Sequence, residues 1–288
     1  MRALRVSPMW ALLRWTSVAC AGLALGCQGA HTPPAVSAAA DQSLPVPYDL
    51  QEAVEEASIL GTHLFLLDAA TARATQALSE RIGPLDTSPV RHYLAVMGDD
   101  AEGKPDGSVL VLFFEGETVP VLTYRVQVSA DPRGAASVTQ QDPPGVVHEP
   151  LTSLLNARWL ALEAVPRSQQ GVSTVLMPQR NGNIVVYVLG ATRQPNTAVL
   201  GRHFRVEVAE DGAQLLSVTA LSKDELELPT RDRAGQRLAA LAITDGDVDH
   251  PTETHVLASR LANVPIYVTT GRGRWKVRAT GIDYLGPR

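Results

Sequence analysis

Two segments of this chain repeat each other at a fixed spacing, and this repeat constrains the fold more than any other feature. YRVQVSAD, at 124–131, matches FRVEVAED, at 204–211, and the same ungapped offset of 80 residues aligns SVT at 137–139 with SVT at 217–219. The match crosses a turn in register, as expected of a duplicated β-hairpin. The alternative is that two amphipathic hairpins converged on common strand residues.

The same order of elements surrounds both copies. Apolar residues recur at steps of three and four from Val54 to Ile82, which predicts an amphipathic helix with a candidate bend at Gly61. A helix followed by two hairpins is predicted at 54–82, 92–114 and 119–140 in the first half, and at 150–165, 172–189 and 202–221 in the second. Between the halves, QDPPG at 141–145 is expected to break the chain.

A shorter third group of elements closes the chain. We expect a helix at 252–262, then strands at 266–270 and 274–280 around a GRG turn, with a further strand at 282–285. The charged segment 224–240 is expected to be helical or a surface connection. The predicted fold class is α+β, with repeated helix plus antiparallel four-stranded sheet units and a shorter C-terminal helix-plus-hairpin unit.

The N-terminus has the pattern of a signal peptide. Arg2, Arg5 and Arg14 precede an uncharged, mostly apolar run that is shorter than the about 20 residues needed to span a bilayer. Its removal would change the net charge from −5 to −8. This negative charge argues against nucleic acid as a partner.

The end of that run, LALGC at 23–27, resembles the lipobox of bacterial lipoproteins. The resemblance implies cleavage before Cys27 and lipid attachment to its thiol, and an anchor in the membrane. Ala24 departs from the Leu that is most usual at its position. Gln28, which is not Asp, favours the outer membrane by the same resemblance. The alternative is an ordinary signal peptide in which Cys27 is incidental.

These observations predict the organisation of the whole chain. The predicted parts are a signal peptide at 1–26, a disordered tether at 27–47, a first helix-plus-sheet unit at 48–142, a second at 148–222, and a linker with a partial C-terminal unit at 223–288. Cys20 and Cys27 are the only cysteines. The folded part therefore has no disulfide, no cysteine nucleophile and no thiolate metal site.

The segment FRVEVAEDGAQLLSV, at 204–218, resembles the last hairpin of PepSY-type domains, and a helix on an antiparallel sheet resembles cystatin-like folds. PepSY-type domains are associated with binding and restraining proteases of the bacterial envelope. The resemblance implies such binding as a hypothesis, and it implies no site residue.

The sharpest polar cluster is TDGDVDHPTETH, at 244–255. Asp245, Asp247 and Asp249 alternate, so carboxylates on one side of an extended chain could bind a hard cation such as Ca²⁺, with His255 nearby. The spacing does not fit an EF-hand loop. The simpler interpretation is a solvated turn that leads into a helix capped by Thr252 or Asp249. No catalytic residue, metal ligand or cofactor is therefore assigned.

Other chemistry-bearing residues have structural interpretations. His63 is expected to be a partly buried packing residue beside the apolar stripe, and Trp159, Trp275 and Tyr267 are expected in the core or on a sheet face. The basic segment 271–274 is expected to be a hairpin turn rather than a phosphate site. The motifs of serine and zinc hydrolases and of nucleotide-binding loops are absent.

The expected function is non-catalytic. We expect an outer-membrane lipoprotein of the bacterial envelope, facing the periplasm or the cell surface, that binds a protein or peptide through a sheet face or edge. Restraint of an envelope protease is one version. The alternatives are a structural lipoprotein without a specific client, and a metal-binding or hydrolytic protein that uses the segment from Asp245 to His255.

Overall fold

A 32-residue helix, α1 (Gln51–Ile82), carries the apolar stripe predicted from the sequence. A 3-10 turn, η2 (Tyr48–Leu50), leads into it. Its buried residues recur every three or four positions, apart from the adjacent pair Ala70 and Thr71: Val54, Ala57, Gly61, Leu64, Leu67, Ala70, Thr71, Ala74 and Leu78. At 1.5 Å per residue such a helix is about 48 Å long. It is therefore long enough to pack against more than one sheet.

The computed structural model describes residues 42–99, 105–116, 119–131, 134–166, 171–191, 194, 196–222 and 226–288. The predicted signal peptide, Cys27 and most of the predicted tether lie outside these residues. No helix within the described ranges is long and apolar enough to cross a membrane.

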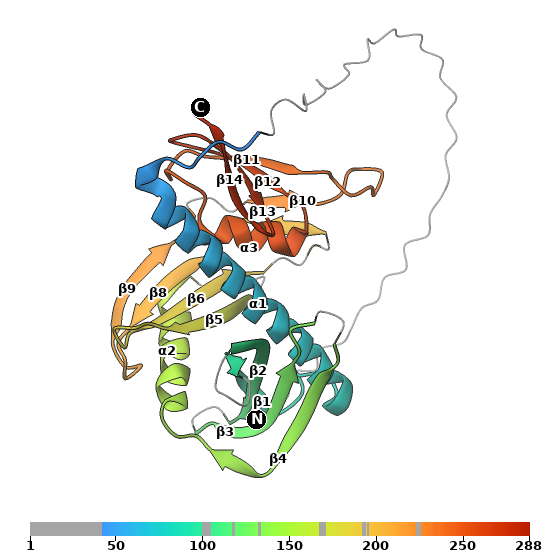
Figure 1. Cartoon of the computed structure of the whole chain (residues 1–288). Coiled ribbons are helices and arrows are strands. Elements are labelled where there is room, and N and C mark those ends of the chain that lie inside the picture. Colours follow the sequence, from blue (N-terminus) through green and yellow to red (C-terminus); the bar gives the residue numbers. More distant parts are fainter. Residues whose placement is uncertain are drawn as a thin grey trace, which may run out of the picture. The chain divides into compact units, whose positions relative to one another are not determined.

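The first two sheets have the predicted composition. The first contains β1 (Val90–Asp99), β2 (Pro105–Glu115), β3 (Val121–Val128) and β4 (Ala136–Val146) in that order, all antiparallel. The helix α2 (Leu151–Ala164) precedes the second. The second contains β5 (Val172–Pro178), β6 (Ile184–Gly190), β8 (Phe204–Val208) and β9 (Leu215–Ala220), also antiparallel and in that order. The α+β fold with repeated helix-plus-sheet units is confirmed (Figure 1).

The sequence repeat coincides with a repeat of strand register. Arg125 pairs with Thr139 and Val126 with Val138 in the first sheet, while Arg205 pairs with Thr219 and Val206 with Val218 in the second. Both pairs are related by the same offset of 80 residues. Val126 packs in the core cluster of α1, and Val206 packs in that of α2. The repeat therefore specifies the same helix-facing side in both units.

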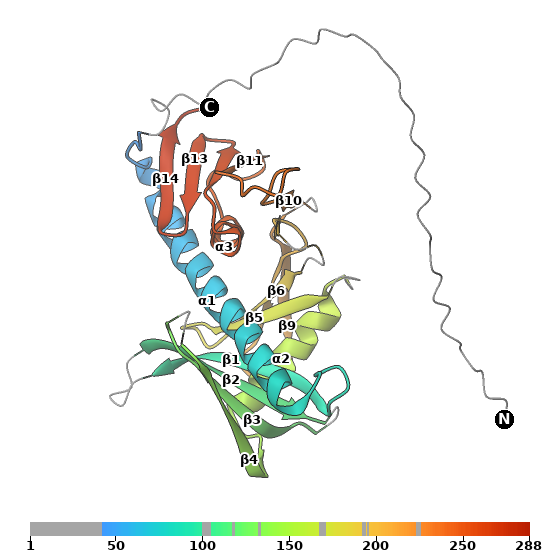
Figure 2. The same ribbon diagram turned by 90° about the vertical axis from the view of Figure 1, so that its right-hand side faces the viewer.

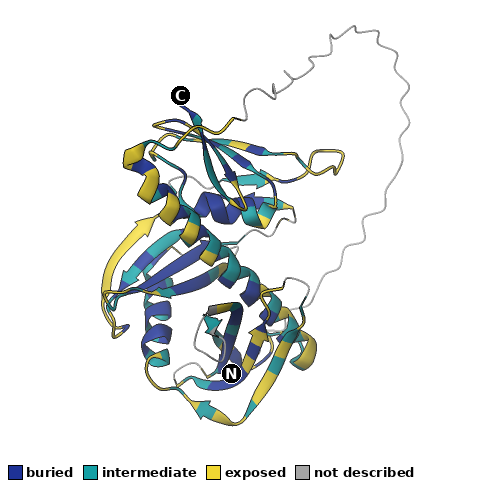
Figure 3. Ribbon diagram, viewed as in Figure 1, coloured by how far each residue is buried: buried dark blue, intermediate teal, exposed yellow. Residues whose placement is uncertain are grey.

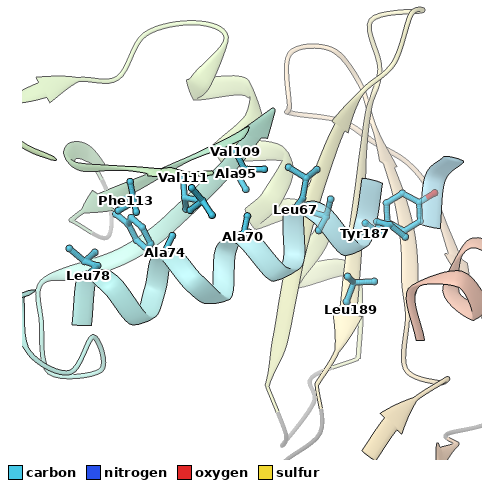
Figure 4. Packing of buried hydrophobic residues seen from close by; sticks show 14 of the residues in the cluster. Leu67, Ala70, Ala74, Leu78, Ala95, Val109, Val111, Phe113, Tyr187 and Leu189 are labelled. Carbon is cyan, nitrogen blue, oxygen red and sulfur yellow. The ribbon is translucent and has the colours of Figure 1, made fainter. Parts of the chain in front are cut away.

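Each sheet is also covered by the helix of the other unit. Val185, Tyr187 and Leu189 of β6 pack in the cluster of α1, beyond the residues of the first sheet (Figure 4). Leu94 and Phe114 of the first sheet pack in the cluster of α2. This exchange of covering helices brings the first strands of the two sheets, β1 and β5, into contact.

The C-terminal unit is larger than predicted. It contains β11 (Leu241–Asp245), α3 (Glu253–Ala262), β12 (Ile266–Thr270), β13 (Arg274–Arg278) and β14 (Gly281–Gly286). The strand β11 pairs parallel to β12 across α3, so the unit has a four-stranded sheet rather than a helix and hairpin alone. The strand β11 was not predicted because it has only five residues and leads into an aspartate-rich turn. In the sequence such a segment looks like part of a loop.

The connection before this unit is not helical in its described part. The segment 226–240 forms β10 (Glu227–Pro229), which pairs with β7 (Thr197–Val199), and then a turn. A surface connection was one of the two predicted alternatives. The short ladder joins the second unit to the third.

The helix α1 continues through Gly61, the expected position of a bend, and Gly61 lies where α3 crosses α1. A Cβ atom at Gly61 would lie 2.5 Å from Cβ of Val256 and 2.6 Å from the carbonyl oxygen of Glu253. Figures 1 and 2 both show α1 passing close to α3 before it reaches the first sheet. The missing side chain allows the two helices to approach.

Two predicted irregular segments are part of the fold. The end of the predicted tether packs on the third sheet, because the Leu44 N–H donates to the Tyr284 carbonyl oxygen at 2.7 Å. The strand β4 continues through 141–145, where Leu122 pairs with Gly145 and Tyr124 with Gln140, so the residues between them bulge from the ladder. Proline is tolerated there because β4 is an edge strand.

Candidate binding groove between two edge strands

The strands β1 and β5 meet at a polar junction. The Thr174 N–H donates to Oη of Tyr93 at 3.0 Å, and Nε of Arg158 donates to Oγ1 of Thr174 at 2.9 Å. The Arg158 guanidinium also lies 4.8 Å from the centre of the Tyr93 ring. Oγ of Ser173 donates to Asp68 of α1 at 2.6 Å. Burial raises the pKa of the Asp68 carboxyl. These contacts hold the two strands together at this point.

Beyond this junction the two strand edges line an open apolar groove. Its volume is about 660 Å³, within the usual range of ligand pockets. The groove is bounded by β1, β5 and α1, with one residue from α2. Its lining residues are Glu56, Ile59, Leu60, His63, Leu67, Leu94, Ala95, Val96, Met97, Leu154, Leu176, Met177, Pro178, Gln179 and Arg180.

The groove also offers main-chain hydrogen-bonding groups. The Thr174 N–H points to Tyr93, away from β6, and residues of a strand alternate in the side to which their main-chain groups point. The N–H and C=O of Leu176 therefore also point away from β6, toward the groove. Within the described residues, β1 pairs only with β2, and β5 only with β6. Such strand edges are templates for an added strand.

The rim of the groove is polar. His63, predicted to be partly buried, is exposed and lines the groove together with Glu56 and Arg180. A smaller cleft of about 270 Å³ shares Glu56, Leu60 and Gln179 with the groove and adds polar groups, so the two lie side by side. Apolar walls with charged groups at the rim suit a segment that is mostly uncharged.

The polar cleft contains a tyrosine that is held neutral. Oη of Tyr187 donates to Oε1 of Glu253 at 3.3 Å. Burial, and next the Glu253 carboxylate, raise the pKa of Tyr187 above its ordinary value. Tyr187 therefore serves as a hydrogen-bond donor to Glu253.

The structure brings together three of the four residues predicted in the aspartate-rich segment. Asp245, Asp247 and His255 line a pocket of about 390 Å³, which Asp249 does not line; the carbonyl oxygen of Asp249 accepts a hydrogen bond from Oγ1 of Thr270. Nε2 of His255 lies 3.6 Å from Oδ2 of Asp245. Nowhere in the described ranges do three His, Cys, Asp or Glu side chains gather as metal ligands.

His255 has a structural role at the start of α3. Its Nδ1 accepts a hydrogen bond from the N–H of Thr252 at 3.0 Å, which completes a capping box. Burial lowers the pKa of His255 to about 4, and the ring is therefore neutral at pH 7. Thr252 caps the helix, as the simpler interpretation of this segment predicts.

The remaining candidates also occupy structural positions. Trp275 is fully buried and donates from Nε1 to Oγ1 of Thr270 at 2.9 Å. Trp159 is half-buried and donates to Nδ1 of His92 at 3.3 Å, and Tyr267 is half-buried. Gly271 and Gly273 lie in the turn between β12 and β13, and Arg272 in that turn forms an ion pair with Asp49.

Sequence reasoning did not identify the groove. Its apolar residues fit the patterns of helices and strands, and nothing in those patterns distinguishes a groove from a core. One available signal was Ile59, an apolar residue off the predicted stripe, which is 50% exposed. No protein-family profile, no curated protein and no solved structure matches this chain.

Proposed function

We propose that this protein binds an extended, mostly apolar segment of a partner protein by strand addition in the groove between β1 and β5. The observation that carries this proposal is that two strand edges and an apolar pocket of about 660 Å³ share one opening. Main-chain hydrogen bonds would supply affinity, and alternate side chains of the segment would enter the pocket.

The groove favours a peptide over a compact polar ligand. Leu176 presents an N–H and a C=O, and Pro178, which has no N–H, presents only a C=O at the same edge. Alternating donors and acceptors along a strand match an extended main chain better than they match an isolated charged group. A bound segment would lie between α1 and α2, both of which contribute lining residues.

The proposed setting is the bacterial envelope, with lipid on Cys27 as the anchor. The lipobox-like sequence supports this part of the proposal, and the chain has no cysteine after Cys27. In this setting the groove holds a protein segment without chemical conversion. Restraint of an envelope protease is one form that such binding would take.

The proposal is tested by photocrosslinking in cells. Benzoylphenylalanine is placed at Ile59, which lines the groove and is 50% exposed, and in a control at Leu261 of α3, which is 52% exposed and lies outside it. We expect one dominant crosslinked partner from position 59 and no such product from position 261. A diffuse smear, or the same products from both positions, would favour a structural lipoprotein without a specific client.

Strand addition has its own readout once the crosslinked segment is known. In hydrogen exchange of the complex, the amide of Leu176 should become protected, since it points toward the groove in the free protein. Ile59→Arg should weaken binding by at least about tenfold, because it places a charge against the apolar segment, whereas Leu261→Arg should not. Binding without protection of the Leu176 amide would contradict strand addition.

A further inference from the structure

The strand β9 is an exposed edge with an apolar sequence. It lies at the opposite edge of the second sheet from β5. All six of its residues are exposed, as its yellow colour in Figure 3 shows. Leu215, Leu216 and Val218 are 40%, 45% and 41% exposed. Apolar side chains are thus accessible on an edge that is separate from the groove.

The outer main-chain groups of β9 can be assigned from one hydrogen bond. The Leu221 N–H donates to the carbonyl oxygen of His203 at 2.9 Å, so the main chain of Leu221 points toward the preceding strand. By alternation, the N–H and C=O groups of Val218 and Ala220 point away from β8. The pairing from Ser217 to Ala220 contains no register shift, so this outer edge is regular.

Charge distinguishes β9 from the outer edges of the other two four-stranded sheets. Charged residues lie on β1 (Arg91), β4 (Asp142), β11 (Asp245) and β14 (Asp283), and charges on edge strands oppose unwanted pairing. The strand β5 is uncharged but faces the groove. From residue 213 to residue 222, around β9, there is neither a charged residue nor a proline.

An uncharged edge is suited to pairing with itself. In an antiparallel pair related by a twofold axis, the strand faces its own symmetry-related copy, so a charge close to the axis would lie near the same charge of the second chain. An edge can select a partner of different sequence by complementary charges or, as at β5, by a side-chain pocket; β9 carries no charge, and its residues line none of the pockets described above. The occupant that this edge fits best is therefore a second copy of the chain.

We propose that this protein forms a twofold-symmetric dimer through antiparallel pairing of β9. Val218 lies opposite its own copy, and Thr219 lies opposite Ser217 of the second chain, so the pairing uses the regular part of the strand. The two four-stranded sheets join into one continuous sheet. The dimer leaves the groove at β5 open, so it does not depend on the proposed peptide binding.

Sedimentation equilibrium of the full-length protein in mild detergent tests the dimer. We expect the wild-type chain to be dimeric at micromolar concentration. Val218→Lys should weaken the dimer by at least about tenfold, since the two ammonium groups would face each other. The matched control is Val146→Lys on β4, where the valine is 72% exposed, and this variant should remain dimeric.

Three outcomes would overturn the proposal. These are a monomeric wild-type chain over the whole concentration range, a Val218→Lys variant that stays dimeric, and a Val146→Lys variant that dissociates equally. If Val218→Lys lacks the circular dichroism spectrum of the wild type, Ala220→Lys is measured in its place, and its oligomeric state decides whether β9 forms the dimer. The alanine side chain at 220 is small and exposed, so it can be replaced with little effect on the core.

Discussion

At the scale of single residues, two buried histidines couple stability to pH. His203 accepts a hydrogen bond from the Gly190 N–H at 3.1 Å, and His255 accepts one from Thr252. Burial lowers the pKa of each to about 4, from an ordinary value of 6.5. Both rings are neutral in the folded protein at pH 5, whereas they are mostly protonated in the unfolded chain.

We therefore predict that the free energy of unfolding falls as the pH is lowered from 6.5 toward 4. In this window the unfolded chain binds more protons, and each histidine contributes a slope of up to about 1.4 kcal/mol per pH unit. Urea denaturation at several pH values measures this slope. His255→Gln should reduce it, while His148→Gln, at an exposed position, should not. Equal slopes in both variants would contradict the prediction.

Residues on the apolar stripe were predictable, and residues at crossings were not. The buried positions of α1 follow from a period that is local in the sequence. The contact of Gly61 with Val256 joins two helices separated by most of the chain. A glycine that bends a helix and a glycine that admits another helix look the same in the sequence.

At the scale of elements, the hairpin that ends the second unit is fixed by contact between its turn and α2. Gly212, in the turn between β8 and β9, has φ of 71°, and a Cβ atom there would lie 2.1 Å from the carbonyl oxygen of Ser153. Gly235 has φ of 78°, but a Cβ atom there would meet nothing within 4 Å. The two glycines thus share a backbone conformation and differ in their surroundings.

We predict that Gly212→Ala lowers the free energy of unfolding by more than Gly235→Ala. Both substitutions carry the cost of a left-handed conformation, about 1–2 kcal/mol. Only the first adds an overlap with main-chain atoms, typically worth about 1–3 kcal/mol more. Urea denaturation of the two variants gives the difference directly. Equal losses would show that α2 can shift to accommodate the methyl group.

Hairpins with strong alternation were predicted correctly, and the pairing of β11 was not. The two copies of the repeated hairpin show period-two patterns over both strands, and their registers agree. The pairing of β11 with β12 depends on α3 between them, which is a property of the packed unit rather than of five residues. The continuation of β4 past two prolines likewise depends on its position at an edge.

At the scale of the whole molecule, the site could not be predicted because it belongs to no single segment. The groove takes its walls from α1, β1, β5 and α2, and it exists because each helix covers the sheet of the other unit. A sequence pattern indicates which residues are buried, but it does not indicate which two edges will meet. The sequence predicted binding through a sheet face or edge, and this stays a prediction.

The proposed membrane anchor leads to a separate prediction. Cys27→Ala should move the protein from the membrane fraction to the soluble fraction, because the acyl chains contribute about 0.8 kcal/mol per buried CH₂ group. Intact mass of the N-terminal peptide from detergent-extracted membranes checks the modification. An unmodified N-terminus cut elsewhere would indicate an ordinary secreted protein, and soluble partners would then be sought first.

The pairing of Leu44 with Tyr284, together with the crossing of α1 and α3, has a consequence for the order of folding. Val54, near the start of α1, packs in the core of the last unit to be synthesised, and Gly61 lies against Val256 of that unit. Contacts between such distant parts of a chain slow folding, because the loop between them must close first. We therefore expect the nascent chain to remain incompletely folded until synthesis ends, a state in which a chain can still be threaded through a narrow translocation channel.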